Sequence, residues 1–135
     1  MKVNLVAFAS TFIIFVAVDF IWLSSMTYVL YKPTLGDILT PEFRIVPAVL
    51  FYLIFVAALT FFAVLPSLAP ERGLGAALLY GAIFGFAAYA TYDLTNQATI
   101  QNWSTLLTVA DLAWGTFLSA LAAGAGHFVT MRFID

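Results

Sequence analysis

Three aspartates lie inside long apolar stretches of the sequence, and they are the residues best placed to do chemistry. Asp19 falls late in the first stretch, Asp93 ends the third, and Asp111 falls early in the fourth. An ionised carboxylate is costly within a bilayer, so such acids usually face the interior of a helical bundle and bind protons, cations or ligands. No Lys or Arg lies in these stretches, and we therefore expect at least one of the three carboxyl groups to carry a proton.

Each aspartate has aromatic or amide neighbours at helical spacing. Trp22 and Trp114 each follow an aspartate by three residues, which puts acid and indole on one helix face. The segments 18–22 and 110–114 resemble each other, and Trp103 lies between the third and fourth stretches. If the helices alternate in direction, all three acids lie toward the same membrane face. The predicted ligand- or proton-binding residues are Asp19, Asp93, Asp111, Trp22, Trp114, Tyr89, Tyr92, Asn96 and Gln97.

A purely structural role for the same residues stays open. Trp and Tyr concentrate at both membrane interfaces without binding any ligand. Asp and Asn can also hold helices together through hydrogen bonds worth roughly 1 kcal/mol. The cluster is thus either a ligand-binding cavity or a polar rim that fixes the bundle. Asp93, which lies closest to the surface, fits the rim best, whereas the deeper Asp19 and Asp111 favour a functional role.

The elements that must position these residues are membrane-spanning helices. Of 135 residues, 64% are hydrophobic and 9% are charged, whereas a soluble domain carries about 25% charged residues. A helix needs roughly 20 apolar residues to cross the hydrocarbon core, and stretches at about 3–26, 45–65, 74–94 and 105–128 reach that length. We therefore predict an all-α integral membrane protein, an antiparallel four-transmembrane-helix bundle, with residues 1–135 forming a single domain.

Turn-forming residues separate the first two stretches, between about 31 and 44. Within this connection, Thr40-Pro41-Glu42 predicts a helix start. Pro47 would then lie inside the second helix, where we expect a kink. The first stretch is not followed by a cleavage site of small residues, so we expect a retained span rather than a signal peptide.

Small residues recur every four positions on the third and fourth stretches. This spacing lets two helices approach each other closely, so we predict that the third and fourth helices pack along these faces. The residues are Ala77, Gly81 and Gly85 in the third stretch and Gly115, Ser119 and Ala123 in the fourth.

Charge and composition restrict the partners and cofactors. The net charge of -2 and the scattered basic residues give no patch for nucleic acid. The chain has no cysteine, and its single histidine, His127, lies toward the membrane face opposite the acids. The ligand sets of haem, zinc and di-iron sites are therefore missing, and we expect no cofactor and no metal. No nucleophile is set up beside a base, which favours a role other than that of an enzyme.

The charges of the connections favour a cytoplasmic N-terminus by a small margin. With both termini in the cytoplasm, three basic residues lie inside and two outside, as the positive-inside rule prefers. A balance this even also leaves dual topology open. The inside residues would be Lys2, Arg72 and Arg132, and the outside residues Lys32 and Arg44.

The motifs resemble those of a bacterial family of predicted four-helix inner-membrane proteins classed as a domain of unknown function. They are the Asp-x-x-Trp of the first stretch, the Tyr-Asp-Leu-Thr-Asn-x-Ala-Thr run over 92–99, Trp103, and the Asp-Leu-Ala-Trp-Gly run over 111–115. The resemblance covers essentially the whole chain. The resemblance implies a four-helix fold in the bacterial inner membrane and favours lipids as the class of substrate. It implies no particular activity.

Two functions remain open. In the first, the chain binds or moves a lipid-like or small cationic molecule in a cavity lined by carboxylates and aromatic rings. In the second, the chain is an accessory or scaffold subunit of a membrane complex, and the polar cluster docks a partner or fixes the bundle. The expected partners are the lipid bilayer and either that small molecule or further protein chains, in a homo-oligomer or a larger complex.

Overall fold

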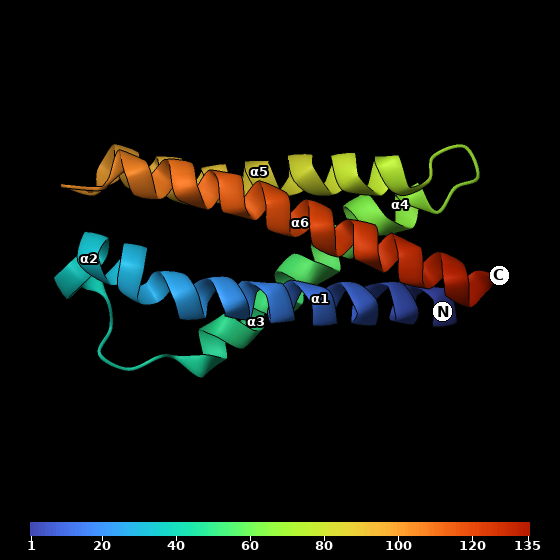
Figure 1. The fold of residues 1–135 in the computed structure, drawn as a ribbon, viewed down its shortest axis with the longest axis horizontal. Helices are drawn as coiled ribbons and strands as arrows, with labels where there is room; N and C mark the ends of the chain where they lie inside the picture. Colours follow the sequence, from blue (N-terminus) through green and yellow to red (C-terminus); the bar gives the residue numbers. More distant parts are fainter.

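Four long helical segments account for almost all of the chain. The computed structural model describes residues 1–135. The four segments long and apolar enough to cross a membrane are Lys2–Ile38, Ile45–Ser67, Gly73–Thr99 and Thr105–Ile134. Successive segments run in opposite directions, and both termini lie at the same end of the bundle (Figure 1). The predicted all-α fold with four membrane-spanning helices is confirmed.

The first span continues well beyond its predicted end near residue 26. It consists of α1 (Lys2–Met26), a π-helical turn η1 (Thr27–Tyr31), α2 (Lys32–Leu35) and a 3-10 turn η2 (Gly36–Ile38). Pro33 does not end this segment, which passes without a break from the π-helical turn into α2. Gly36 has a φ of +49°, a conformation that glycine adopts readily, and the regular helix ends there.

The second span begins later than the sequence predicted. The Thr40 hydroxyl donates to the backbone carbonyl of Glu42 at 2.8 Å, so this segment forms a turn and the predicted helix start at Thr40 is wrong. The span consists of α3 (Ile45–Leu59), a π-helical turn η3 (Thr60–Val64) and α4 (Leu65–Ser67). Pro47 therefore lies in the first turn of α3, where it removes no helical hydrogen bond and requires no kink.

The third and fourth spans are the single helices α5 (Leu74–Thr99) and α6 (Thr105–Ile134). They meet along the small residues, as predicted. A Cβ atom added at Gly81 would lie 2.8 Å from the Cβ of Ala123, and one added at Gly85 would overlap the side chain of Ser119. The two backbones are therefore in direct contact, and their antiparallel register continues along the seam to Asp93 and Asp111.

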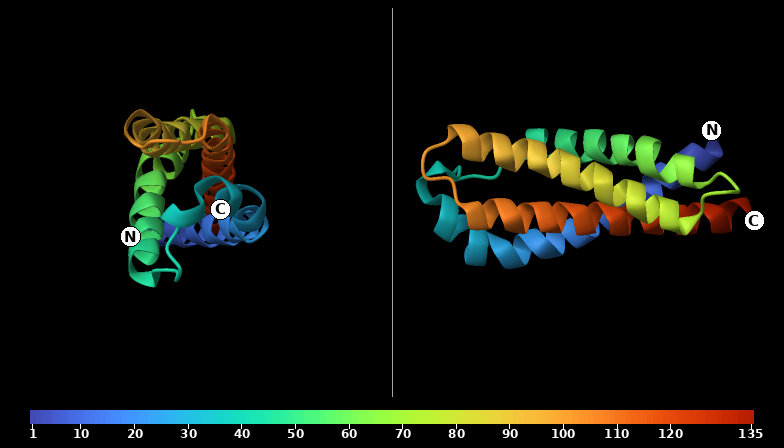
Figure 2. Two further views of the ribbon diagram at one scale, coloured as in Figure 1. Left: turned by 90° about the vertical axis from the view of Figure 1, so that its left-hand side faces the viewer. Right: turned by 90° about the horizontal axis from the view of Figure 1, so that it is seen from above.

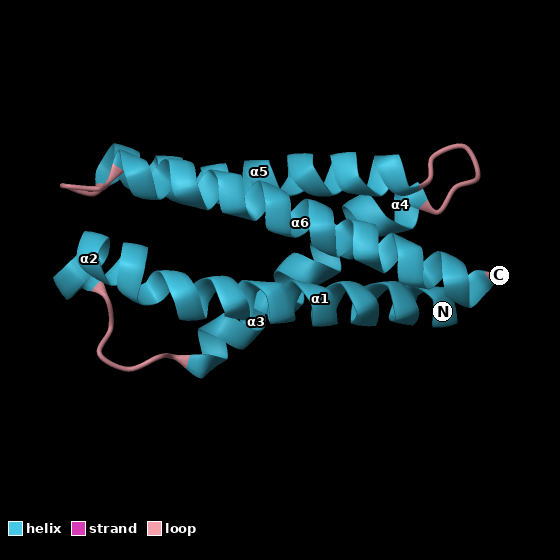
Figure 3. Ribbon diagram, in the orientation of Figure 1, coloured by secondary structure: helices cyan, strands magenta, loops and turns pink.

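The apolar core lies near the middle of the bundle, where the first, second and fourth spans meet. Its largest fully buried side chains include Phe15, Leu59 and Leu118. Only 27 of the 135 residues are buried, and large apolar side chains cover the outer surface, which suits a lipid solvent and not water. Figure 2 shows the helices around this core from the end and from above, and Figure 3 shows that the chain contains no strand.

The second span does not reach the acid-bearing end of the bundle. It has 23 residues, against 27 to 37 in the other spans, and α3 begins part of the way along α1 (Figures 1 and 2). The connection 39–44 takes its place at that level. Three helices and a loop therefore enclose the acid-bearing end, which leaves space beside α5.

Candidate functional site

Asp19, on α1, is held by donors from two other spans. The Tyr52 hydroxyl of α3 donates to Oδ2 at 2.5 Å, and the Trp114 indole N–H of α6 donates to Oδ1 at 3.0 Å. The residue is only 6% exposed. Because each carboxyl oxygen accepts one hydrogen bond, Asp19 ties the first, second and fourth spans together.

Asp111, on α6, is held from the first span but keeps one oxygen open. The Tyr31 hydroxyl of η1 donates to Oδ1 at 2.6 Å, and the same hydroxyl accepts from the Trp22 indole N–H at 3.0 Å. No hydroxyl, indole or amide group of the protein donates to Oδ2 of Asp111, and this atom is not sealed inside the protein. The carboxyl group therefore has spare capacity to accept a hydrogen bond or to pair with a cation.

The tryptophan of each Asp-x-x-Trp motif supports the aspartate of the other motif. Because α1 and α6 run antiparallel, the indole of one motif lies opposite the acid of the other. Trp114 bonds Asp19 directly, and Trp22 reaches Asp111 through the hydroxyl of Tyr31. The two indoles stack with centroids 4.3 Å apart and planes 8° from parallel. The similarity of the two sequence segments thus corresponds to a crossed pairing in space.

The π-helical turn η1 explains how Tyr31 reaches Asp111. Tyr31 follows Asp19 by twelve residues, which an unbroken α-helix would place about 120° apart around its axis. The extra residue of the π-helical turn removes one step of about 100° and leaves the two side chains about 20° apart. Tyr31 therefore faces the bundle interior together with Asp19 and Trp22.

Asp93, on α5, is fully buried and receives no hydrogen bond at either oxygen. It lies beside Asp111 across the seam of small residues. A buried carboxyl without a donor is best accommodated when it carries a proton that it can donate to a neighbouring carboxylate. The pair of Asp93 and Asp111 therefore has room for one shared proton.

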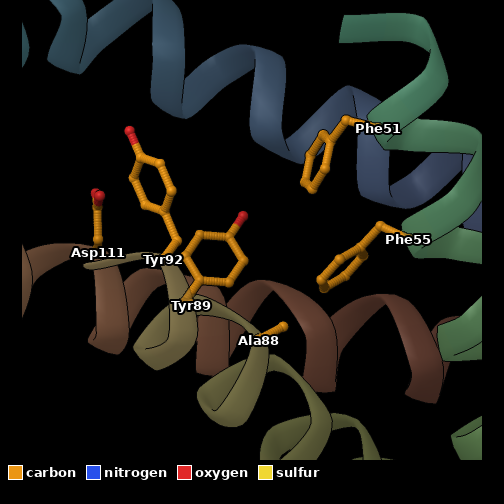
Figure 4. Close-up of a pocket in the computed structure, with 6 residues that line it drawn as sticks. All are labelled: Phe51, Phe55, Ala88, Tyr89, Tyr92 and Asp111. Carbon is orange, nitrogen blue, oxygen red and sulfur yellow. The ribbon is translucent and has the colours of Figure 1, made fainter. Parts of the chain in front are cut away.

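Two adjoining cavities lie at this end of the bundle, and their volumes fall in the range of small-molecule sites, about 300–1,000 Å³. The first has a volume of about 400 Å³ and is lined by Phe51, Phe55, Ala88, Tyr89, Tyr92 and Asp111 (Figure 4). The second has a volume of about 330 Å³, and its lining includes Asp19, Trp22, Tyr31, Tyr52, Trp103 and Trp114. Phe51, Tyr89, Tyr92 and Asp111 line both.

The cavities contain carboxyl groups without a basic side chain to balance them. Neither cavity is lined by a Lys or an Arg. Lys32 is exposed, and its ammonium group lies 4.3 Å from the centre of the exposed Tyr28 ring. No group of three or more His, Cys, Asp or Glu side chains is arranged to hold a metal ion. The polar groups therefore suit a cation or a hydrogen-bond donor, whereas an anion would be repelled by the carboxylates.

The structure separates the predicted site residues into three groups. Six of them line the cavities, namely Asp19, Asp111, Trp22, Trp114, Tyr89 and Tyr92. Asp93 touches neither cavity and lies behind Asp111. Asn96 and Gln97, one turn further along α5, also line neither cavity, and Gln97 donates instead to the hydroxyl of Thr105 at 2.9 Å.

The two tyrosines that hold the acids, Tyr31 and Tyr52, are not among the predicted site residues. Tyr31 falls in the predicted connection between the first two stretches, because nothing in the residue pattern predicts a π-helical turn. Tyr52 lies in a stretch already rich in aromatic residues. A hydroxyl in an otherwise apolar part of a span is the one signal that could have identified it, because a buried phenol usually finds a hydrogen-bond partner.

The opposite end of the bundle contains the single histidine, as predicted. The Nδ1 atom of His127 lies 2.8 Å from the hydroxyl oxygen of Ser67, which itself donates to the backbone carbonyl of Val64 at 2.6 Å. Because this hydroxyl has only one proton, Nδ1 of His127 must be the donor in the contact. The contact joins the second and fourth spans and leaves Ser67 without a base that could activate it.

Comparison with known proteins identifies a family and no individual relative. The profile of DUF2177, described as a predicted membrane protein, matches residues 4–128, a range that includes all three aspartates. Neither the curated proteins nor the solved structures contain a significant match. The four spans and this match agree on a multi-pass membrane protein. The chain therefore belongs to DUF2177, a family of predicted membrane proteins whose function is unknown.

Proposed function

We propose that this protein binds or moves a lipid-like or small cationic molecule in the two adjoining cavities. The observation that carries the proposal is the open Oδ2 atom of Asp111, at the wall of an otherwise apolar and aromatic cavity. A cation at this position gains from the carboxylate and from the faces of the tyrosine and tryptophan rings. The apolar part of the same molecule would contact side chains such as Phe51 and Phe55.

An accessory or scaffold role is the second candidate, and Asp19 is the observation that favours it. Both of its oxygens are occupied by donors of the protein, so this acid serves the fold. Asp111 therefore supports the binding role, and Asp19 supports the scaffold role. A scaffold needs Asp19 and is indifferent to the charge of Asp111, whereas a binding site needs the charge of Asp111.

The decisive experiment compares Asp111→Asn with Asp37→Asn. The first variant keeps an acceptor for Tyr31 and offers an amide donor to Asp93, so the fold should persist while the charge is lost. Asp37 is an exposed acid at the same end of the bundle that lines neither cavity, which makes it a matched control. The probes are tetramethylammonium and dodecyltrimethylammonium, added to purified protein in a nonionic detergent. Binding is followed by tryptophan fluorescence, since two indoles stack in the second cavity.

The expected result is binding of both probes to the wild type and to Asp37→Asn. Binding to Asp111→Asn should be weaker by about tenfold or more, because a desolvated cation loses its charge partner. Equal binding by the wild type and by Asp111→Asn would refute the proposal. The scaffold role would then be favoured, provided that a variant such as Asp19→Ala is destabilised.

We further place the protein in the bacterial inner membrane with both termini in the cytoplasm, so that the acid-bearing end faces the periplasm. The support is the small excess of basic residues at the terminal end of the bundle. The chain has no native cysteine, so single substitutions can report orientation. In intact cells, a membrane-impermeant maleimide should label Asp37→Cys and spare Glu71→Cys. The reverse pattern would overturn this orientation, and labelling of both would indicate dual topology.

A further inference from the structure

The larger of the two cavities opens sideways between α3 and α5. The backbone of the second span packs against α5 at η3, and α3 then diverges from α5 toward the acid-bearing end. The two sides of the opening reach the outer surface, because Phe51 is 42% exposed and Tyr92 is 57% exposed. Both residues lie within membrane-spanning segments. The mouth of the cavity therefore lies on the side of the bundle, within the length of the membrane-spanning segments.

Polarity rises from this mouth toward the inside of the bundle. Figure 4 shows Phe51 and Phe55 on α3 across from Tyr89 and Tyr92 on α5, with Asp111 on α6 beyond the tyrosines. The hydroxyl of Tyr89 has no partner in the protein and is not sealed off, so it adds a second free polar group to the cavity that Asp111 also lines. One path thus leads from an apolar mouth, past two phenols, to a carboxylate.

A neighbouring cavity shows what a simple gap between helices looks like in this protein. It also lies between the second and third spans, has a volume of about 350 Å³, and is lined by Phe62, Tyr80, Ile83 and Phe84. It contains no acid, so an apolar chain can contact its walls, but a cationic group finds no carboxylate there. An acid inside the cavity distinguishes the cavity at Asp111 from this gap.

We propose that a single-chain cationic amphiphile enters this cavity laterally from the bilayer, with its cationic head at Asp111 and its chain between α3 and α5. The inference rests on the proposed function and deepens it, because it names the class of ligand and its route. A cationic head is favoured over a phosphate head because the cavity contains carboxylates and no basic group. The aromatic rings beside Asp111 support the same choice.

The test narrows the mouth without touching the acid. Ala88→Trp places a large side chain in the opening between α3 and α5, and Ala88→Leu does so with less bulk in case the first variant folds poorly. Ala82→Trp is the matched control, because Ala82 is a half-buried alanine on the same helix that lines an acid-free groove on another face. The probes are again tetramethylammonium, which has no chain, and dodecyltrimethylammonium, which has one.

Ala88→Trp should weaken binding of dodecyltrimethylammonium by about tenfold or more, because the chain would overlap the added ring. Tetramethylammonium should bind to this variant within about twofold of the wild type, since it can reach Asp111 through the second cavity. Ala82→Trp should leave both probes unaffected. A dodecyl probe with a diazirine at the end of its chain should label α3 or α5 near the mouth.

The outcomes separate the two proposals. If both probes depend on Asp111 but the Ala88 variants bind the dodecyl probe as well as the wild type does, lateral entry is wrong and the binding function stands. Labelling confined to the connection 39–44 would also overturn lateral entry. If neither probe depends on Asp111, the proposed function fails first, and this inference fails with it.

Discussion

The contact between Asp19 and Tyr52 provides a quantitative test of how the acids hold the bundle together. Tyr52→Phe removes the donor at 2.5 Å and leaves Asp19 with Trp114 alone. A hydrogen bond to a charged group contributes roughly 1.5–3 kcal/mol in proteins, whereas bonds between transmembrane helices average about 0.6 kcal/mol and reach about 1.7. Because the bond is short and its acceptor is buried, we expect the upper end of the membrane range, about 1–2 kcal/mol.

A double-mutant cycle isolates this contribution. Asp19→Ala removes the acceptor of both donors and should cost about 2–4 kcal/mol, since two buried polar groups lose their partner. The double variant should lose about 1 kcal/mol less unfolding free energy than the sum of the losses of the two single variants. The free energy of unfolding is measured by titrating the folded protein in mild detergent with sodium dodecyl sulfate. Tyr80→Phe is the control, because this hydroxyl is at the other end of the bundle and bonds to no other residue of the protein. A coupling below about 0.3 kcal/mol would contradict the assigned role of Asp19.

Three further predictions use the same unfolding assay or circular dichroism. Gly115→Ala should lower the free energy of unfolding by about 1–3 kcal/mol, because its Cβ would overlap an aromatic ring of α5. Gly75→Ala should be neutral or stabilising, because no atom lies within 4 Å of the added Cβ. Asp93→Asn should leave the free energy of unfolding within about 0.5 kcal/mol of the wild type, since the amide supplies the proton that the buried carboxyl must otherwise carry. A loss as large as that of Asp19→Ala would be evidence against a proton on Asp93. Trp22→Phe should abolish the exciton signal of the stacked indoles, and Trp103→Phe should preserve it; survival of the signal in the first variant would rule out the stack.

The spans could be predicted from the sequence because hydropathy is a property of composition along the chain. Four apolar stretches of sufficient length require four helices in lipid, whatever their rotation. The ends of the helices could not be predicted as well, because they depend on single contacts. Thr40 and Pro41 are typical of a helix start. The Thr40 hydroxyl nevertheless bonds within a local turn, and the helix begins at Ile45.

The acids and their tryptophans could be predicted because charge in an apolar span is visible in the sequence and i, i+3 spacing is local. The donors Tyr31 and Tyr52 could not, because their contacts depend on how helices distant in sequence are rotated. For Tyr31 the rotation depends on a π-helical turn, which alters the phase of every residue after it. Gln97 lies on the predicted face but beyond the level of the cavities, and it bonds the start of α6.

The crossed pairing of the two motifs has a consequence for how the protein is made. Asp19 and Trp114 are 95 positions apart, so a ribosome completes the first span long before the indole that serves its acid exists. Until the fourth span inserts, Asp19 has only Tyr52 as a donor, and the glycine face of α5 lacks the helix that it packs against. The insertion of the fourth span is therefore a single step that satisfies the acid, covers the glycines and completes both cavities together. A chain interrupted before that step would present a half-paired acid and an open helix face within the bilayer, which distinguishes an unfinished molecule from a finished one.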